Sequence, residues 1–332
     1  MSTAITYLNG ADIGRLALTN EEILAAVEGG LDAQGRRLVV LEPRVHLVPQ
    51  DSAIGHFNVL RGVVHPLELA GVKVVGDFLG NHLQGLPSEF GVLTLFDPST
   101  GQPRAVLNAT ALTDMRTGAM TALGAKYLAR KSSRVLGHIG ARGTAYWNIR
   151  LLDHLHDFEE IRVHSKRAAS REQLARRLTG ELGKPVRAVD SWEACVRDAD
   201  VVVEASRLPK PAPLLKTGWI KPGALVMPYG TMSAVELSLT DIMDKVVVDD
   251  WGQCQKGTTF GALRQHVDVG RLTAANLHAE LGQIVAGARP GRESERETIL
   301  FWHRGLALSD IALGAAMLAK ARMLGLGQQL EF

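Results

Sequence analysis

Residues 134–145 read RVLGHIGARGTA, the stretch that decides the fold. RVLGHI predicts a short buried strand, which leads through a glycine-rich turn into a segment that predicts a helix. The glycine permits a tight turn, and a helix N-terminus offers backbone donors to a diphosphate. Arg142, however, stands where a second glycine normally lets the backbone approach the phosphates. The stretch predicts a dinucleotide-binding loop or, alternatively, a glycine-rich turn without a ligand; its residues are Gly140, Ala141, Arg142, Gly143, Thr144 and Ala145.

After this turn, strand and helix patterns alternate along the chain. Such alternation is typical of βαβ units and of a parallel sheet buried on both faces. The expected strands are IRVHS (161–165), PVRAV (185–189), ADVVVEAS (199–206), GALVMPY (223–229) and KVVVDD (245–250). The sequence therefore predicts an α/β protein with a Rossmann-type parallel-sheet domain.

Before the turn, the pattern favours an α+β domain with a largely antiparallel sheet. Thr19, followed three residues later by Glu22, predicts a capped helix start. A helical pattern at 110–129 looks like a connection between domains, and residues 297–321 also favour mostly helix. The expected strands are PRVHLVP (43–49), GHFNVLRGVV (55–64), GVKVVGDF (71–78), GVLTLFD (91–97) and PRAVLNA (103–109), with a hairpin turn at 97–101.

Composition narrows the class of protein. A chain of 332 residues with 46% apolar and 22% charged residues suits two globular domains. A formal net charge of +2 argues against nucleic acid as a partner. Two cysteines, Cys195 and Cys254, without paired spacing favour a reducing compartment and no metal site. Without a signal-like start or a long apolar run, we expect a cytoplasmic protein with no membrane partner.

The end of the second expected Rossmann strand bears on cofactor choice. An NAD enzyme usually places a carboxylate there against the ribose 2′-hydroxyl. This chain instead continues Ser165-Lys166-Arg167, whose hydroxyl and two cations suit a 2′-phosphate. We expect NADP(H) to be preferred; the alternative is a solvated basic turn in an enzyme that uses NAD(H).

Several longer segments resemble the ornithine cyclodeaminase/mu-crystallin family. They are KVVGDFLGN (73–81), GLPSEFGVLTLFDPSTGQP (85–103), LTDMRTGAMTALGAKYLA (112–129) and GLALSDIALG (305–314). The resemblance implies a homodimer whose protomer has a substrate and dimerisation domain, 1–115 with 305–332, and a Rossmann domain, 116–304, with the active site at their junction. It also implies that Arg44, Lys73 and Arg116 hold the substrate carboxylate. The residues that it places at the cofactor are Ser88, Thr117 and Ser206, and we expect Tyr229 and Gly230 to join them.

The chain departs from the family in two places. Residues 228–237 contain no aspartate where the cyclodeaminases have one beside the reacting amine. We therefore expect a reductase of a small α-imino acid, or an amino-acid dehydrogenase, rather than an ammonia-releasing cyclodeaminase. His303 and Arg304 replace the family's small or apolar residues. Together with Arg61, His56 or Asn58, they suit a dicarboxylic imino acid such as iminosuccinate. Alternatively, Arg304 pairs with Asp310 or another local carboxylate, and His303 is a packed or exposed helix residue.

Lys73 is the expected proton donor to the imine nitrogen, because it is the most mobile of the three cations. Water or His303 are the alternatives. Two other functions stay open: ornithine cyclodeamination with tightly bound NAD, and a non-catalytic binding protein of the mu-crystallin kind, because fold alone does not establish function.

Overall fold

The computed structural model describes residues 4–50, 54–257 and 260–332. It divides into two compact units: unit 1 comprises Met1–Arg116 and Gly305–Phe332, and unit 2 comprises Thr117–Arg304. Helix α3 (Thr110–Leu128) contains the first boundary, so Arg116, expected in the Rossmann domain, belongs to unit 1. None of the helices in the described ranges is long and apolar enough to cross a membrane.

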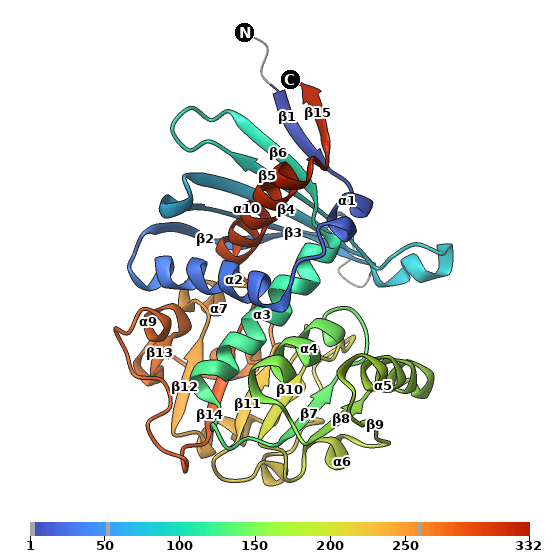
Figure 1. Cartoon of the computed structure of the whole chain (residues 1–332). Helices are drawn as coiled ribbons and strands as arrows, with labels where there is room; N and C mark the ends of the chain where they lie inside the picture. Colours follow the sequence, from blue (N-terminus) through green and yellow to red (C-terminus); the bar gives the residue numbers. More distant parts are fainter. Residues whose placement is uncertain (1–3, 51–53, 258–259) are drawn as a thin grey trace. The chain divides into compact units, whose positions relative to one another are not determined.

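Unit 1 contains a seven-stranded sheet in the described residues, in the order β15-β1-β6-β5-β4-β3-β2 (Figure 1). Neighbouring strands are antiparallel except β1 and β6, which are parallel. The strands are β1 (Ala4–Leu8), β2 (Val39–Leu47), β3 (His56–Val64), β4 (Leu69–Asp77), β5 (Glu89–Phe96), β6 (Pro103–Asn108) and β15 (Gln328–Glu331). The helices are α1 (Gly10–Arg15), α2 (Asn20–Gly35) and α10 (Ala307–Leu324), with short 3-10 turns η1 (His65–Leu67) and η2 (Leu79–Gln84).

The two faces of this sheet differ. Helix α10 packs against β3, β4 and β5 on one face and also contacts α2. In β4 and β5, buried and exposed side chains alternate, as expected when one face of an antiparallel sheet is covered. Helix α2 begins with the predicted capping box, in which the Thr19 hydroxyl accepts the Glu22 N–H at 3.2 Å and the Glu22 carboxylate accepts the Thr19 N–H at 2.8 Å.

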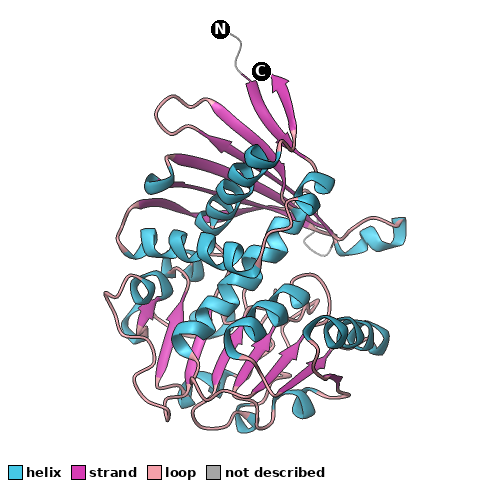
Figure 2. Ribbon diagram, viewed as in Figure 1, coloured by secondary structure: helices cyan, strands magenta, loops and turns pink. Residues whose placement is uncertain are grey.

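Unit 2 contains an eight-stranded parallel sheet, in the order β13-β12-β14-β11-β10-β7-β8-β9 among the described residues (Figure 2). The strands are β7 (Val135–Ile139), β8 (Glu160–His164), β9 (Val186–Ala188), β10 (Val201–Glu204), β11 (Leu225–Pro228), β12 (Lys245–Val248), β13 (Ala279–Glu280) and β14 (Ile299–Trp302). The helices are α4 (Ala145–His156), α5 (Ala168–Leu182), α6 (Trp192–Val196), α7 (Trp251–Gln255), α8 (Arg264–Asp268) and α9 (Leu281–Val285), with 3-10 turns η3 (Thr217–Trp219), η4 (Leu237–Ile242) and η5 (Ala274–Asn276).

The strand order of unit 2 reverses between β7 and β10. From β7 the chain adds β8 and β9 on one side, and then returns to add β10 and β11 on the other. In open parallel sheets, ligands bind outside the carboxyl ends of the strands at such a reversal. This edge of unit 2 is therefore the expected position of a dinucleotide.

The segment 297–321, expected to be mostly helical, contains a strand before its helix. Ile299–Trp302 form strand β14, and helix α10 begins at Ala307 and covers the rest of the segment. All four residues of β14 are buried, between β11 and β12. A short apolar run buried on both faces carries no periodicity that separates strand from helix.

Candidate functional site

The candidate substrate site begins with a buried lysine on β4 of unit 1. Lys73 is 1% exposed, and its ammonium group donates to Asp310 Oδ1 at 2.6 Å and to Thr113 Oγ1 at 3.2 Å. Asp310 lies in the first turn of α10 and is fully buried. Because buried charges need partners, the sequence-distant aspartate explains how a lysine can occupy the core of this unit.

Arg116, on α3, shares this aspartate. Its Nε lies 2.9 Å from Asp310 Oδ1, the same oxygen that Lys73 contacts. The guanidinium also lies against the backbone of Gly305, where a Cβ would come within 2.1 Å of Arg116 Nη1 and where φ is +83°. Only glycine accommodates both the contact and the conformation at this position.

Arg44 reaches the same place from the edge strand β2. The register places Glu42 opposite Arg61 and Val45 opposite Val59, so Pro43 and Arg44 together face the single residue Leu60, as in a β-bulge. Proline is tolerated here because β2 lies at the edge of the sheet. The Arg44 guanidinium donates to the carbonyl of Gly305 at 2.9 Å.

The structure thus brings the three expected cations of unit 1 together around Asp310 and Gly305. Burial, followed by the positive charges of Arg116 and Arg44, lowers the pKa of Lys73 to about 7, against the opposing effect of Asp310. A lysine with this pKa holds a proton that it can release near neutral pH. The cluster can bind an anion and exchange a proton with it.

The polar residues expected nearby fall on both faces of the sheet. The Asn58 amide nitrogen lies 3.3 Å from His56 Nε2. Because side chains alternate along a strand, both residues lie on the same face of β3 as the buried Leu60. Arg61 lies on the opposite face of β3. It lies 3.4 Å from Glu42 and donates to the carbonyl of Pro43. Arg61 is therefore separated from the cation cluster by the sheet.

In unit 2, the glycine turn lies at the carboxyl end of β7. Gly140 has a φ of +112°, and a Cβ there would meet the carbonyl oxygen of Ala205 at 2.9 Å. Thr144 precedes α4 without a side-chain cap. No hydrogen bond between described residues uses the backbone amides of 141–144 as donors. Free amides at the start of a twelve-residue helix fit an anionic diphosphate.

The turn opens onto a hollow between α4 and α5. Its volume is about 240 Å³, and it is lined by Ala141, Arg142, Gly143, Tyr146, Ser170, Gln173, Leu174 and Arg177. Ala145, the first residue of α4, is buried, as expected for close packing of this helix. Arg142 and Gly143 are exposed at the mouth of the hollow.

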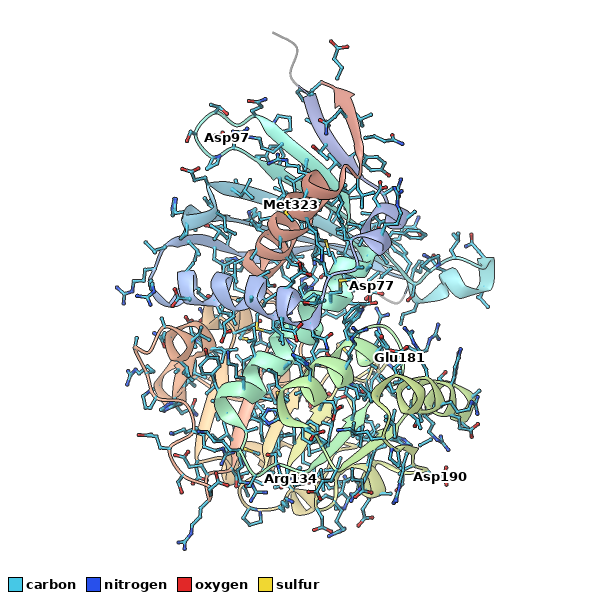
Figure 3. The ribbon with its side chains drawn as sticks, viewed as in Figure 1. Asp77, Asp97, Arg134, Glu181, Asp190 and Met323 are labelled. Atoms are coloured by element: carbon cyan, nitrogen blue, oxygen red, sulfur yellow. The ribbon has the colours of Figure 1, made fainter. Side chains whose placement is uncertain are left out.

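Two exposed cations follow β8. Ser165 donates to the carbonyl of Arg167 at 3.0 Å, while Lys166 and Arg167 are exposed. The neighbouring Arg171 donates to the carbonyl of Ser165 at 2.9 Å and pairs with Asp190, which is labelled in Figure 3. The sequence 165–167 contains no carboxylate of the kind that binds a ribose 2′-hydroxyl.

Tyr229 and His303 stack on each other at the ends of β11 and β14. Their ring centroids are 4.4 Å apart with an interplanar angle of 29°. The Tyr229 hydroxyl lies 2.6 Å from Thr144 Oγ1, and His303 Nε2 lies 3.1 Å from Thr121 Oγ1. Tyr229 therefore contacts the start of α4 through its hydroxyl.

Arg304 is held by backbone groups. Its Nη1 donates to the carbonyls of Gln253 and Lys256, each at 3.0 Å, and its amide donates to Asp249 at 2.7 Å. Burial lowers the pKa of its guanidinium. These contacts tie Arg304 to the segment around α7.

The remaining expected cofactor residues occupy four different segments. Ser88 follows η2 in unit 1, and its carbonyl accepts the Phe78 N–H at 2.8 Å. Thr117 is buried on α3 in unit 2. Ser206 and Gly230 follow β10 and β11, and the Ser206 amide donates to Glu204 Oε1 at 2.7 Å.

Sequence reasoning missed two buried acids. Asp310 was considered only as a partner of Arg304, whereas the structure pairs it with Lys73 and Arg116. Glu204, at the end of the apolar run VVVE, was not singled out. A carboxylate inside an apolar run is itself a signal, because such a group is seldom buried without a partner or a function. Among the described residues, no group of three or more histidine, cysteine, aspartate or glutamate side chains is arranged to hold a metal ion.

Unit 2 has a parallel sheet in which strand β7 leads through a glycine turn into helix α4. This arrangement defines unit 2 as a domain of the Rossmann, dinucleotide-binding class. The chain belongs to the ornithine cyclodeaminase/mu-crystallin family, whose model matches residues 6–323. It is 31% identical to alanine dehydrogenase of Archaeoglobus fulgidus over 95% of each chain. These findings confirm the expected family.

Two solved structures resemble the whole chain. One is Δ1-pyrroline-2-carboxylate reductase of Thermococcus litoralis in complex with NADH and L-proline, with a TM-score of 0.90, 27% identity and coverage of 98% of this chain and 100% of that one. The other is iminosuccinate reductase of Paracoccus denitrificans in complex with NAD+, with a TM-score of 0.89, 26% identity and coverage of 99% and 100%. Both likenesses and the alanine dehydrogenase support the expected fold class and the expected class of enzyme, the oxidoreductases.

Proposed function

We propose that this protein is an NAD(P)H-dependent reductase of a small α-imino acid, which can also run in reverse as an amino-acid dehydrogenase. The observation that carries the proposal is the buried cluster in which Lys73 and Arg116 share one oxygen of Asp310, with Arg44 held beside them on Gly305. The relatives named above reduce imines or oxidise amino acids, which supports the same chemistry.

The substrate carboxylate binds to the cluster through charge. Arg116 and Arg44 each offer a guanidinium, a group suited to paired hydrogen bonds with a carboxylate. Lys73 and Arg116 share one oxygen of a single carboxylate, Asp310. A substrate carboxylate would add a second negative charge beside these two cations and would be oriented by them.

Lys73 controls the proton of the imine. Because the pKa of Lys73 is about 7, its ammonium group can protonate the substrate nitrogen and be reprotonated near neutral pH. Asp310 and Thr113 orient the Lys73 ammonium group through its hydrogen bonds. When bound, the reduced nicotinamide supplies the hydride to the imine carbon.

The residues of the glycine turn suit a dinucleotide diphosphate, with Gly140 giving close approach and the amides of 141–144 as donors. Ser88, Thr117, Ser206, Tyr229 and Gly230 complete the proposed set of cofactor residues. Lys166 and Arg167 favour NADP(H) over NAD(H), because their charges are exposed where a 2′-phosphate is recognised. The relatives in complex with NADH and NAD+ keep NAD(H) as the second choice.

A dicarboxylic imino acid is the proposed substrate class. Its second carboxylate would bind His303 and Arg304, and a relative named iminosuccinate reductase supports this choice. Both hydrogen bonds of the Arg304 guanidinium described above use Nη1, so its other nitrogens offer donors. The absence of an aspartate at 228–237 argues against cyclodeamination.

We also propose that the protein is a homodimer through the open face of the unit 1 sheet. Val45, Val59, Val74 and Val92 pair across β2, β3, β4 and β5 in one row. Three of them are 50%, 38% and 50% exposed, in the order Val45, Val74 and Val92. An apolar row of this kind on a sheet face is typical of a contact with a second copy of the chain.

Oligomeric state in solution tests this interface. Val74→Asp combined with Val92→Asp should convert the dimer to a monomer in analytical ultracentrifugation, because a buried carboxylate opposes association. Val269→Asp, at an exposed valine of unit 2, is the matched control and should stay dimeric. A double variant that stays dimeric would overturn the proposed interface.

Nucleotide oxidation tests the activity. The purified protein is mixed with NADPH or NADH and with 2-oxo acids plus ammonia or methylamine, or with cyclic imines such as pyrroline-2-carboxylate. We expect consumption of the nucleotide, fastest with NADPH and oxaloacetate plus ammonia. Ammonia release from ornithine without added nucleotide would instead establish a cyclodeaminase, and binding of nucleotide without turnover would favour a binding protein.

A further inference from the structure

Glu204 occupies a position in unit 2 that no part of the proposed mechanism uses. It is the last residue of β10 and pairs with Ile139 of β7 on one side and Pro228 of β11 on the other. This is the carboxyl end of the sheet at the reversal of strand order, directly beside the Gly140 turn. Glu204 thus lies at the edge where we place the dinucleotide.

The Glu204 carboxyl group is sealed from solvent. It is 0% exposed, and Oε1 accepts the Ser206 amide at 2.7 Å. Oε2 has no hydrogen-bond partner among the described residues, and a Cβ on Gly230 would approach it to 2.7 Å. The main-chain carbonyl of Glu204 accepts the amides of Tyr229 and Gly230 at 2.8 and 3.1 Å. Both loops that follow β10 and β11 therefore close over this carboxyl group.

Among the described residues, no positively charged side chain pairs with Glu204. Ile139 and Pro228, on the flanking strands, carry no charge, and His138 points to the other face, where it contacts Asn148. Two arginines stand in the neighbouring loops: Arg207 directly follows Ser206, and Arg142 lies in the turn after β7 and lines the hollow between α4 and α5; both side chains are exposed. Farther away, Asp249 follows β12 and accepts the backbone amide of Arg304, which follows β14. No ion pair of a described residue involves Glu204.

Burial raises the pKa of Glu204 to about 7, against the opposing effect of Ser206 and of the Gly230 backbone. The Ser206 hydroxyl favours the charged form from close by, but without hydrogen-bond geometry. An ionised carboxylate here repels a ligand that carries a diphosphate, since the buried environment screens the two charges poorly. The neutral acid does not.

We propose that dinucleotide binding puts a proton on Glu204, so that this residue couples the affinity for the cofactor to pH. The inference rests on the proposed function for the place of the dinucleotide. By linkage, a ligand that favours the protonated form must bind more weakly once the carboxyl group ionises. Glu204 is a positioning residue, because its contacts are with the two loops.

Calorimetric titration of the full-length protein tests the coupling. NADH and ADP-ribose are the probes, because the 2′-phosphate of NADPH titrates in the same range and would obscure the result. Titration in two buffers of different ionisation enthalpy reports the protons taken up. We expect about half a proton per dinucleotide near pH 7.5, and affinity about tenfold weaker at about pH 8.5 than at about pH 6.

Substitution assigns the proton to its residue. Glu204→Gln keeps the shape and the acceptor for the Ser206 amide, and should abolish both the uptake and the pH dependence while binding tightly at high pH. Glu193→Gln on α6 removes the same charge from an exposed carboxylate that accepts a hydrogen bond from Arg197 at 3.0 Å, and should behave as wild type. Should Glu204→Gln not fold by circular dichroism, Glu204→Thr replaces it.

The outcomes separate this inference from the proposed function. If neither probe binds at any pH, the proposed function fails. If both bind without proton uptake by the wild type, or if the Glu204 variants retain that uptake, the role of Glu204 is overturned while the function stands.

Discussion

Two buried titratable side chains, one in each unit, reach nearly the same pKa from opposite directions. The pKa of Lys73 is lowered to about 7 and the pKa of Glu204 is raised to about 7, and burial is the largest cause of both shifts. Lys73 has a counter-ion in Asp310, whereas Glu204 has a neutral hydrogen-bond partner, the Ser206 amide. The comparison teaches that burial can bring the pKa of an acid and of a base into the neutral range from opposite sides, and that charged neighbours then adjust it.

We expect the largest effect when the ammonium group of Lys73 is removed. Lys73→Met should lower turnover by about three to four orders of magnitude, because a positioned proton donor and a carboxylate ligand are lost together. Steady-state rates of imine reduction measure this, with NADH affinity expected to be unchanged. Lys245→Met is the matched control, since Lys245 is a largely buried lysine paired with Glu293 and Glu297 in unit 2. A loss below tenfold would show that Lys73 is not the proton donor.

Removing Asp310, the counter-ion of Lys73, tests how much this partner contributes to stability. Asp310→Asn should lower the free energy of unfolding by about 3 to 5 kcal/mol, because Lys73 and Arg116 are then left buried without their carboxylate. Urea denaturation measures the change. Adding Lys73→Met to this variant should restore part of the stability. If Asp310→Asn alone costs under about 1 kcal/mol, the pair contributes little to the fold.

The pH dependence of stability should show the two groups with opposite signs. The raised pKa of Glu204 favours folding below its unfolded value and loses that contribution as pH rises from about 4.5 to about 7. The lowered pKa of Lys73 makes stability rise as pH goes from about 7 to about 10.5. Relative to wild type, Glu204→Gln should gain about 3 kcal/mol between about pH 4.5 and pH 8. An equal difference at both ends would contradict the shift.

The smallest effect concerns cations that stay in solvent. Lys166→Ala with Arg167→Ala should weaken NADPH binding about tenfold and leave NADH binding unchanged, because exposed charges are screened and each contact adds little. Fluorescence titration with both nucleotides measures this. The control is Arg176→Ala, which removes an exposed cation on α5. Equal losses for both nucleotides would remove the preference for NADP(H).

The fold of unit 2 was predictable because its signal is local. Each strand of a parallel sheet is a short apolar run, and the glycine turn marks the first crossover. β14 was missed because Ile299–Trp302 is apolar on both faces and directly precedes a helical pattern. Periodicity cannot assign four residues that lack it.

The candidate site was predictable only in part, because its geometry is not local. Motif resemblance singled out Lys73 and Arg116, but their shared partner lies 237 residues beyond Lys73 along the chain. No pattern in one sequence pairs such distant residues. Glu204 was visible as an acid within an apolar run, yet its position at the strand reversal appears only when the order of the strands is known.

The bulge in β2 bears on how this protein could change over evolutionary time. Pro43 and Arg44 together oppose one residue, so a single-codon deletion of Arg44 would leave the flanking Glu42 and Val45 with their present pairing. A lineage could thereby discard one of its carboxylate-binding arginines while its sheet stayed intact. Loss of catalysis without loss of the fold, the step from an enzyme to a binding protein, would then require only three nucleotides.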